Sequence, residues 1–318
     1  MKKGNIIYIC GRAHSGSTIL DIVLNSCPDV ISVGQMVSGL KDGPSRLCSC
    51  GKRRDSCEFW VGIIDDMISL GYSIQEIETL AYEQANLFSQ PQTWLSSATK
   101  NRLALLRNLT LDIYVSATRR SGSANLVDSS KEPTRALFLA RHIEQTRILH
   151  LVRDPRSVVY SHVWRMDKEN GYFQMRNRKF YMPSLKPIFV VLVAAGWTVG
   201  NFLCEAVKIL RPEVVLRVYY ETLCSDPDRE IRRIGKFLDI DTTAVRQKIA
   251  TGQALNTGHL IGGNDFRLNQ NVTFSAGRVE DKILPIWMNM VIFTFCAPLM
   301  VMYGYKWIRN IKKNINAC

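Results

Sequence analysis

One short stretch near the start of the chain, residues 6–20, constrains the fold more than any other. Residues 6–10 form an apolar, β-prone run, and from Ser17 onward the apolar side chains follow helical spacing. Gly11 and Gly16 bracket the turn between the two segments. A strand, a tight turn and a helix in this order aim several backbone N–H groups and the helix dipole at one point. The stretch therefore predicts a cradle for a phosphate or a sulfate group.

The spacing of this turn, Gly-x4-Gly-Ser-Thr, resembles the phosphate-binding loop of nucleoside triphosphatases, but Ser17 stands where that loop has a lysine. The lysine reaches the β- and γ-phosphates of a nucleoside triphosphate, so its absence disfavours a kinase or nucleotidase. Two interpretations remain open for the loop alone. It is either a binding site for a smaller anionic group or an ordinary βα turn with a capped helix.

Length and composition indicate how the chain is organised. Its 318 residues are 46% hydrophobic, enough for a sizeable core, and no Pro/Gly/Ser-rich linker or internal repeat divides them. A single domain over residues 1–318 is predicted, with a helical insertion or lid over roughly 58–120. The formal net charge of +13 comes from dispersed basic residues without a nucleic-acid motif. Nucleic acid is therefore not an expected partner.

Two apolar segments, residues 188–199 and 286–303, raise the question of membrane contact. Gly196 interrupts the first segment and Pro298 the second, which favours buried core helices and leaves peripheral membrane contact open. No signal peptide is visible before the first strand, and the nine cysteines suggest a mostly reduced chain. A cytoplasmic location is the resulting expectation.

Three of the cysteines, Cys48, Cys50 and Cys57, lie close together in the sequence. A zinc site needs a fourth ligand, and no histidine lies near them in the sequence. A disulfide or a cluster of structural thiols stays open, and no metal is predicted.

Strand-like and helix-like segments alternate along the chain. Further strands are expected at 30–33, 125–128, 146–152 and 213–219. Helices are expected at 16–26, 58–70, 73–89, 94–118, 133–142, 155–165, 187–210, 226–237, 242–250 and 280–303. Residues 38–57 and 252–278 are expected to form loops. The alternation predicts an α/β fold in which helices flank a P-loop-like parallel sheet.

Distinctive residues follow four of the expected strands. They are the loop 11–18, the triplet Ser129-Ser130-Lys131, Arg153 and Tyr220. Because α/β sheets bind ligands at the carboxyl ends of their parallel strands, we expect these four groups to meet at one edge.

The helix expected at 155–165 adds further anion ligands. Ser161 and Arg165 share one of its faces at i, i+4. Together with Arg153, the hydroxyl and the second guanidinium make a suitable clamp for a phosphate.

These motifs together resemble those of sulfotransferases that use 3′-phosphoadenosine 5′-phosphosulfate (PAPS), in particular the tyrosylprotein/carbohydrate branch. The loop 11–20 resembles the family's 5′-phosphosulfate loop, and residues 151–161, LVRDPRSVVYS, resemble its 3′-phosphate motif. Residues 218–227 resemble the stretch whose tyrosine lies by the adenine, and 297–305 resemble the closing helix of that branch. The resemblance leaves out roughly residues 60–120.

The resemblance implies a role for each matching residue. Implied ligands of the donor are Arg12, Ser15, Gly16, Ser17, Thr18, Arg153, Ser161, Arg165 and Tyr220. Implied catalytic residues are His14, Lys131 and Gln35. Lys131 matches a catalytic lysine whose ammonium would stabilise charge that grows in the transition state. The implied donor is PAPS, the product is adenosine 3′,5′-bisphosphate (PAP), and no metal is implied.

Two positions depart from the family pattern. His14 stands where a lysine or arginine contacts the bridging oxygen, and a protonated imidazole could take over this contact. Gln35 stands where related enzymes have the glutamate that serves as base, and an amide cannot take a proton. Gln35 would then position the acceptor while His14 or Asp128 acts as base, or the enzyme would be impaired.

The sequence thus predicts a PAPS-dependent sulfotransferase acting on a hydroxyl or an amine of a small-molecule or glycan acceptor, carbohydrate or lipid-linked. Two alternatives stay open. One is a non-catalytic protein that binds PAP or a sulfated ligand, and the other is a P-loop nucleotide kinase.

Overall fold

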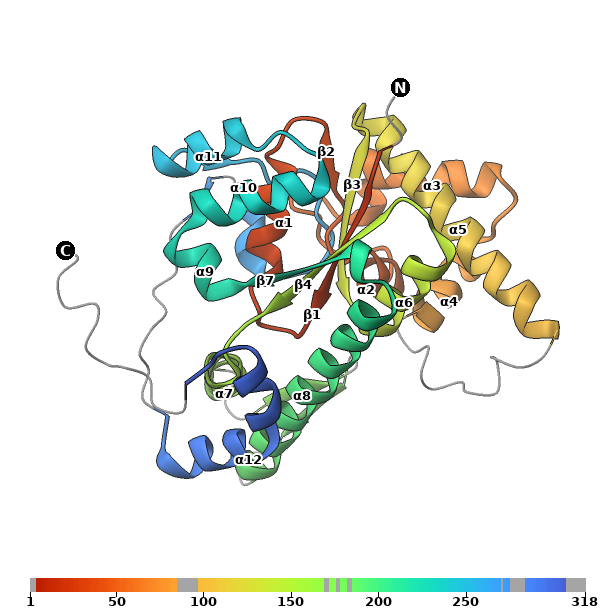
Figure 1. Cartoon of the computed structure of the whole chain (residues 1–318). Helices are drawn as coiled ribbons and strands as arrows, with labels where there is room; N and C mark the ends of the chain where they lie inside the picture. The colour runs from red at the N-terminus through yellow and green to blue at the C-terminus, as the bar shows by residue number, and fades with distance from the viewer. Residues whose placement is uncertain are drawn as a thin grey trace.

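A five-stranded parallel sheet forms the centre of the computed structural model, which describes residues 4–84, 97–168, 172–175, 178–181, 185–269, 271–274 and 284–306. The strand order is β2-β3-β1-β4-β7, and all four neighbouring pairs run parallel. The strands are β1 (Ile6–Gly11), β2 (Val30–Ser32), β3 (Asn125–Lys131), β4 (Thr146–Val152) and β7 (Val215–Tyr219). Helices cover both faces of this sheet (Figure 1), so the predicted α/β fold is confirmed.

Apart from α2 and α9, the helices lie close to the expected ranges. They are α1 (Ser17–Asn25), α2 (Met36–Lys41), α3 (Glu58–Ser69), α4 (Ile74–Gln84), α5 (Ser97–Ser121), α6 (Pro133–His142), α7 (Pro155–Lys168), α8 (Lys186–Leu210), α9 (Tyr220–Ser225), α10 (Pro227–Leu238), α11 (Thr243–Ala250) and α12 (Ile286–Met302). Expected helical residues 85–89, 94–96 and 280–283, and residues 270 and 275–278 of the expected loop, lie outside the described residues.

Several short elements were not expected from the sequence. They are α2, α9, the 3-10 turns η1 (Arg54–Ser56), η5 (Pro212–Val214) and η6 (Asp265–Leu268), and the strand pairs β5 (Tyr172–Met175) with β6 (Arg178–Tyr181) and β8 (Ala254–Leu255) with β9 (Val272–Thr273). Each is too short for its periodicity to stand out from a loop.

Alternate side chains of β1 enter two different cores. Ile7 and Ile9 face a core to which α1, α10 and α11 contribute, whereas Tyr8 and Cys10 face a core built with α3, α5 and α6. All four side chains are at most 1% exposed. This two-sided burial explains why the central strand is a continuous apolar run without polar alternation.

The helices of the expected insertion pack directly onto the sheet. Trp60 and Met67 of α3 and Ile113 of α5 share one buried cluster with Tyr8 and Leu126 of the sheet. The buried residues of α3 and α5 therefore belong to the main core, and a helical insertion or lid over roughly 58–120 stays a prediction.

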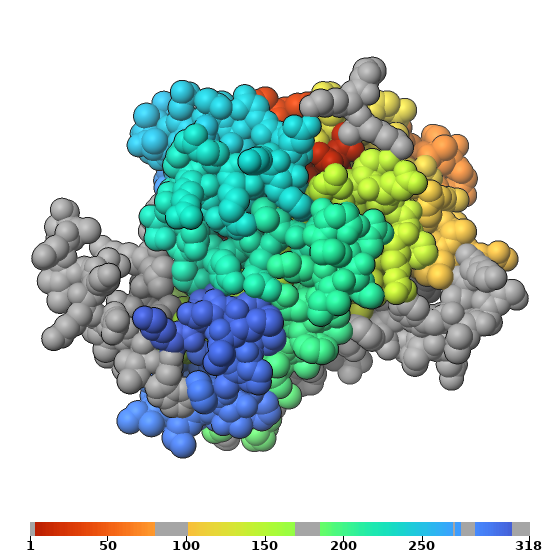
Figure 2. Space-filling model, in the orientation of Figure 1, coloured from red at the N-terminus to blue at the C-terminus, as the bar shows by residue number. Residues whose placement is uncertain are grey.

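Helices α7, α8 and α12 form a third core beyond the carboxyl ends of the strands (Figure 1). Helix α8 is long and apolar enough to cross a membrane by length and composition, but 44% of its most apolar window is buried inside the protein. Helices α8 and α12, which are adjacent in Figure 2, also carry exposed apolar side chains. Among them are Leu192, Val199, Phe202, Met290 and Val301.

Candidate active site

The structure brings the four groups that follow the strands together at one edge of the sheet. Arg153, just after β4, donates a 2.7 Å hydrogen bond from Nη1 to the carbonyl oxygen of His14 in the loop after β1. The same guanidinium lies over the ring of Tyr220, 4.3 Å from its centroid, after β7. Arg153 therefore ties three strand ends to one another.

Gly16 makes the close approach of Tyr220 to the loop possible. Its φ is +92°, and a Cβ at this position would lie 2.3 Å from Cδ2 of Tyr220. A side chain here would meet both backbone strain and a clash, so glycine is the residue that fits. Tyr220 itself begins α9, and its ring forms one wall of the site.

Gly16→Ala is expected to lower the free energy of unfolding by about 1–3 kcal/mol, because the added methyl group overpacks against Tyr220. Gly43→Ala is the matched control, since Gly43 has a φ of +85° and open space around it. Urea denaturation of both variants measures the difference. Equal losses would show that strain at φ, rather than contact with Tyr220, requires the glycine.

Arg12 lies against α8 and links the loop to that helix. A Cβ on Gly200 would lie 2.4 Å from Cδ of Arg12, and one on Gly196 would lie 2.8 Å from its Nη2. The two glycines that interrupt the apolar run of α8 therefore leave room for the arginine. Burial lowers the pKa of Arg12, whose guanidinium remains a cation at neutral pH.

His14 is neutral in this setting. Burial, followed by the charges of Lys131, Arg165 and Arg153, lowers the pKa of its imidazole to about 4. A contact of protonated His14 with the bridging oxygen would therefore require that a bound anion raise its pKa. The same charges show that several cations surround the loop, which is the electrostatic setting of an anion site.

His162 of α7 is a site residue that sequence reasoning missed. Its ring packs edge-on against His14 with 4.2 Å between centroids. Burial, then the charges of His14, Arg12 and Arg165, lower its pKa. The available signal was its position directly after Ser161 in the 3′-phosphate motif.

Lys131 and Gln35 meet opposite the loop. In the amide orientation that satisfies both neighbours, the Gln35 side-chain oxygen accepts hydrogen bonds from Lys131 Nζ at 2.7 Å and from the Gly263 N–H at 3.3 Å. Burial lowers the pKa of Lys131 to about 8, although Asp21 and Glu132 oppose this shift. Gln35 thus accepts a hydrogen bond from the Lys131 side chain, which is mostly protonated at neutral pH.

Asp128 is not available as a base. Its carboxylate is wholly buried and accepts hydrogen bonds from Tyr114 Oη at 2.6 Å, from Arg135 Nε at 3.1 Å and from the Ser130 N–H at 2.9 Å. These partners make Asp128 a structural carboxylate, so this candidate is wrong.

Asp21 of α1 is a buried carboxyl group that sequence reasoning missed. It accepts hydrogen bonds from the hydroxyl groups of Ser32 and Ser129. Burial raises its pKa to about 7, and its charge in turn raises the pKa of Lys131.

The remaining predicted ligands lie around the same edge. Ser15 and Ser17 are buried in the loop, while Ser161 and the exposed Arg165 lie on α7. Thr18 Oγ1 accepts a 3.0 Å hydrogen bond from the Asn264 N–H, so the segment after β8 also borders the site.

Comparison with known proteins gives the class to which this fold and site belong. The model of the sulfotransferase family matches residues 7–244, well over half of the chain. The chain therefore belongs to the sulfotransferase family.

Two relatives illustrate the similarity. A protein from Caenorhabditis briggsae with the provisional name protein-tyrosine sulfotransferase is 28% identical over 157 residues, 48% of this chain and 48% of that protein. The chain thus spans about half the length of this curated relative. The sulfotransferase STF9 from Mycobacterium avium superposes with a TM-score of 0.53 at 11% identity, covering 96% of this chain and 78% of that one. The second similarity supports the fold.

Proposed function

We propose that this sulfotransferase uses PAPS as donor and transfers its sulfuryl group to a hydroxyl or amine of a small-molecule or glycan acceptor. When bound, PAPS supplies an activated sulfuryl group on a single 5′-phosphate, and PAP is left after transfer. A loop without the lysine that grips β- and γ-phosphates suits such a donor. The cations around the loop would balance its charge.

Arg153 is the observation that carries this proposal. Its Nη1 is fixed by the loop and its guanidinium by Tyr220, yet its Nε is buried without a hydrogen-bond partner in the described structure. A buried donor without a partner costs about 1–3 kcal/mol. A phosphate oxygen would satisfy it, and the resemblance assigns the 3′-phosphate to this residue.

The contacts and pKa values suggest how the chain's own residues divide the chemistry. Lys131, an ammonium at neutral pH, would stabilise the negative charge that develops on the leaving oxygen. Neutral His14 would accept the proton of the acceptor group, and a bound anion would raise its low pKa towards neutrality. Gln35 would position Lys131 through its amide oxygen.

Calorimetric titration of Arg153→Ala with PAP and with adenosine 5′-phosphosulfate tests the assignment. The loss of a charged hydrogen bond, about 1.5–3 kcal/mol, should weaken PAP binding about 10- to 150-fold. Adenosine 5′-phosphosulfate, which lacks the 3′-phosphate, should be affected much less. Arg232→Ala is the control, because Arg232 pairs with Asp228 on the exposed face of α10.

Equal losses for both ligands would contradict the 3′-phosphate assignment. A wild-type protein that binds ATP but not PAP would contradict the use of PAPS and favour a kinase.

The acceptor class can be narrowed by a screen with radiolabelled PAPS. The exposed apolar side chains of α8 and α12 favour including lipid-linked sugars beside free carbohydrates and small amines. Transfer to lipid-linked sugars only in the presence of vesicles would support peripheral membrane contact.

A further inference from the structure

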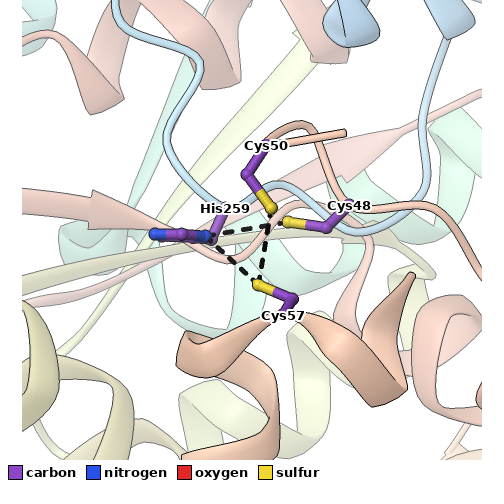
Figure 3. A group of neighbouring side chains, drawn as sticks. All are labelled: Cys48, Cys50, Cys57 and His259. Carbon is purple, nitrogen blue, oxygen red and sulfur yellow. Dashed lines mark hydrogen bonds between the residues drawn. The ribbon is translucent and has the colours of Figure 1, made fainter. Parts of the chain in front are cut away.

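Three cysteines and one histidine gather beside the candidate active site, from segments far apart in the sequence (Figure 3). Cys48 and Cys50 lie in the loop after α2, Cys57 caps the start of α3, and His259 lies after β8. His259 is 202 positions from Cys57 in the chain. A histidine that is remote in the sequence therefore lies beside the three cysteines in the folded chain.

Three separations within the group are close to the edges of a zinc tetrahedron. His259 Nδ1 lies 3.4 Å from Cys57 Sγ and 3.8 Å from Cys48 Sγ, and Cys50 Sγ lies 3.5 Å from Cys57 Sγ. All the ligand atoms lie within 4.8 Å of one another. Around a zinc ion with Zn–S of about 2.3 Å and Zn–N of about 2.0–2.1 Å, tetrahedral ligand atoms are separated by roughly 3.6–3.8 Å.

The surrounding side chains fix the histidine with Nδ1 towards the thiols. Its ring stacks on Phe59 at 4.7 Å between centroids and 11° between planes. The carbonyl oxygen of His259 accepts a 2.9 Å hydrogen bond from Trp60 Nε1. These two contacts restrict the ring and the backbone of His259.

The charge of a bound metal cluster can be balanced within the fold. Three thiolates and a dication leave one net negative charge. The buried guanidinium of Arg267, which donates to the Leu47 carbonyl at 2.9 Å, lies close enough to balance it.

We propose that Cys48, Cys50, Cys57 and His259 form a structural zinc site. All four positions of the tetrahedron would be filled by the protein, which is the pattern of structural rather than catalytic zinc. The main alternative, a disulfide, would use only two of the thiols at about 2.0 Å and leave the third thiol and the imidazole without a role.

The site would fasten the segment around His259 to the wall of the active site. Cys48 and Gly34 both form isolated bridges with Ile261, two residues after the histidine. The Gln35 N–H donates a 2.8 Å hydrogen bond to the Ile261 carbonyl, and Gly263 lies beside the Gln35 side chain. Zinc would thus hold the backbone that positions Gln35 next to Lys131.

Metal analysis of the full chain tests this proposal independently of PAPS and of transfer. Protein purified under reducing conditions on a metal-free resin should contain one zinc per chain by mass spectrometry. After exchange for cobalt, the visible d–d bands of tetrahedral Co(II) and a thiolate charge-transfer band should appear.

Two variants should lose this signal and one should keep it. His259→Ala and Cys50→Ser remove a proposed ligand, and Cys50 is exposed, so its replacement should leave packing intact. Both should lower bound zinc severalfold and change or abolish the cobalt bands. Cys224→Ser removes a buried thiol outside the cluster and should retain both.

Reduced, folded wild-type protein that binds neither zinc nor cobalt would overturn the proposal. So would a metal content that falls equally in Cys50→Ser and Cys224→Ser, or a disulfide among the three cysteines in protein isolated without added oxidant.

Discussion

Lys131→Met is expected to lower kcat about 100- to 1,000-fold, with a much smaller effect on PAP binding. The ammonium is held by Gln35 and would stabilise charge that is fully developed only in the transition state. PAP lacks the sulfuryl group, so its affinity reports little of this contact. Lys236→Met, at an exposed lysine of α10, controls for the loss of one positive charge.

The pH dependence of kcat tests the role of Lys131 more specifically than the loss of kcat in Lys131→Met. Because burial lowers the pKa of Lys131 to about 8, wild-type kcat should fall as the pH rises through about 8 and the ammonium loses its proton. Lys131→Arg keeps its charge, so the alkaline limb should move to higher pH. Gln35→Glu places a carboxylate beside the ammonium, which raises the pKa of Lys131 and moves the limb in the same direction. An alkaline limb that stays in place in both variants would rule out Lys131 as its source.

The second large effect is expected from His14→Ala. Loss of the proposed base should lower the rate of transfer about 100- to 10,000-fold while PAP binding remains largely intact. His142→Ala, an exposed histidine of α6, is the control. Single-turnover measurement with radiolabelled PAPS separates the transfer step from product release.

The Gln35→Glu background tells whether a carboxylate can replace His14. If His14 is the base, its loss should be as severe in Gln35→Glu as in the native chain. A His14→Ala, Gln35→Glu double variant that regains most of the lost rate would instead show that residue 35 can serve as base. PAP-binding protein that transfers to no acceptor class in any of these backgrounds would support the non-catalytic alternative.

The sheet and the meeting of the strand ends could be predicted because they depend on local signals. Each strand is a short apolar run that ends in polar or charged residues, and parallel strands place those ends at one edge. Lys131 and Arg153 were found in this way. The residues next to Lys131 in the sequence do not show that the Gln35 amide accepts a hydrogen bond from it. Those next to Arg153 do not show that its Nε is buried without a partner.

The remaining features depend on contacts between distant segments. In the sequence, Gly196 and Gly200 interrupt an apolar helix. The structure shows that they leave room for Arg12. Asp128 lies in β3 and was a candidate base, but Arg135 and Tyr114 donate hydrogen bonds to its carboxylate. His259 lies 202 positions from Cys57 in the chain, so only the fold brings it beside the cysteines.

The hydrogen bond from the Asn264 N–H to Thr18 joins residues 246 positions apart. A ribosome must therefore add the 246 residues that follow Thr18 before this contact can form, and a loop of that length closes slowly. While those residues are synthesised, the nascent chain carries its β1 loop without the segment that closes it. Donor binding should then report completed folding, because a ligand that needs both segments stabilises only chains in which they have met.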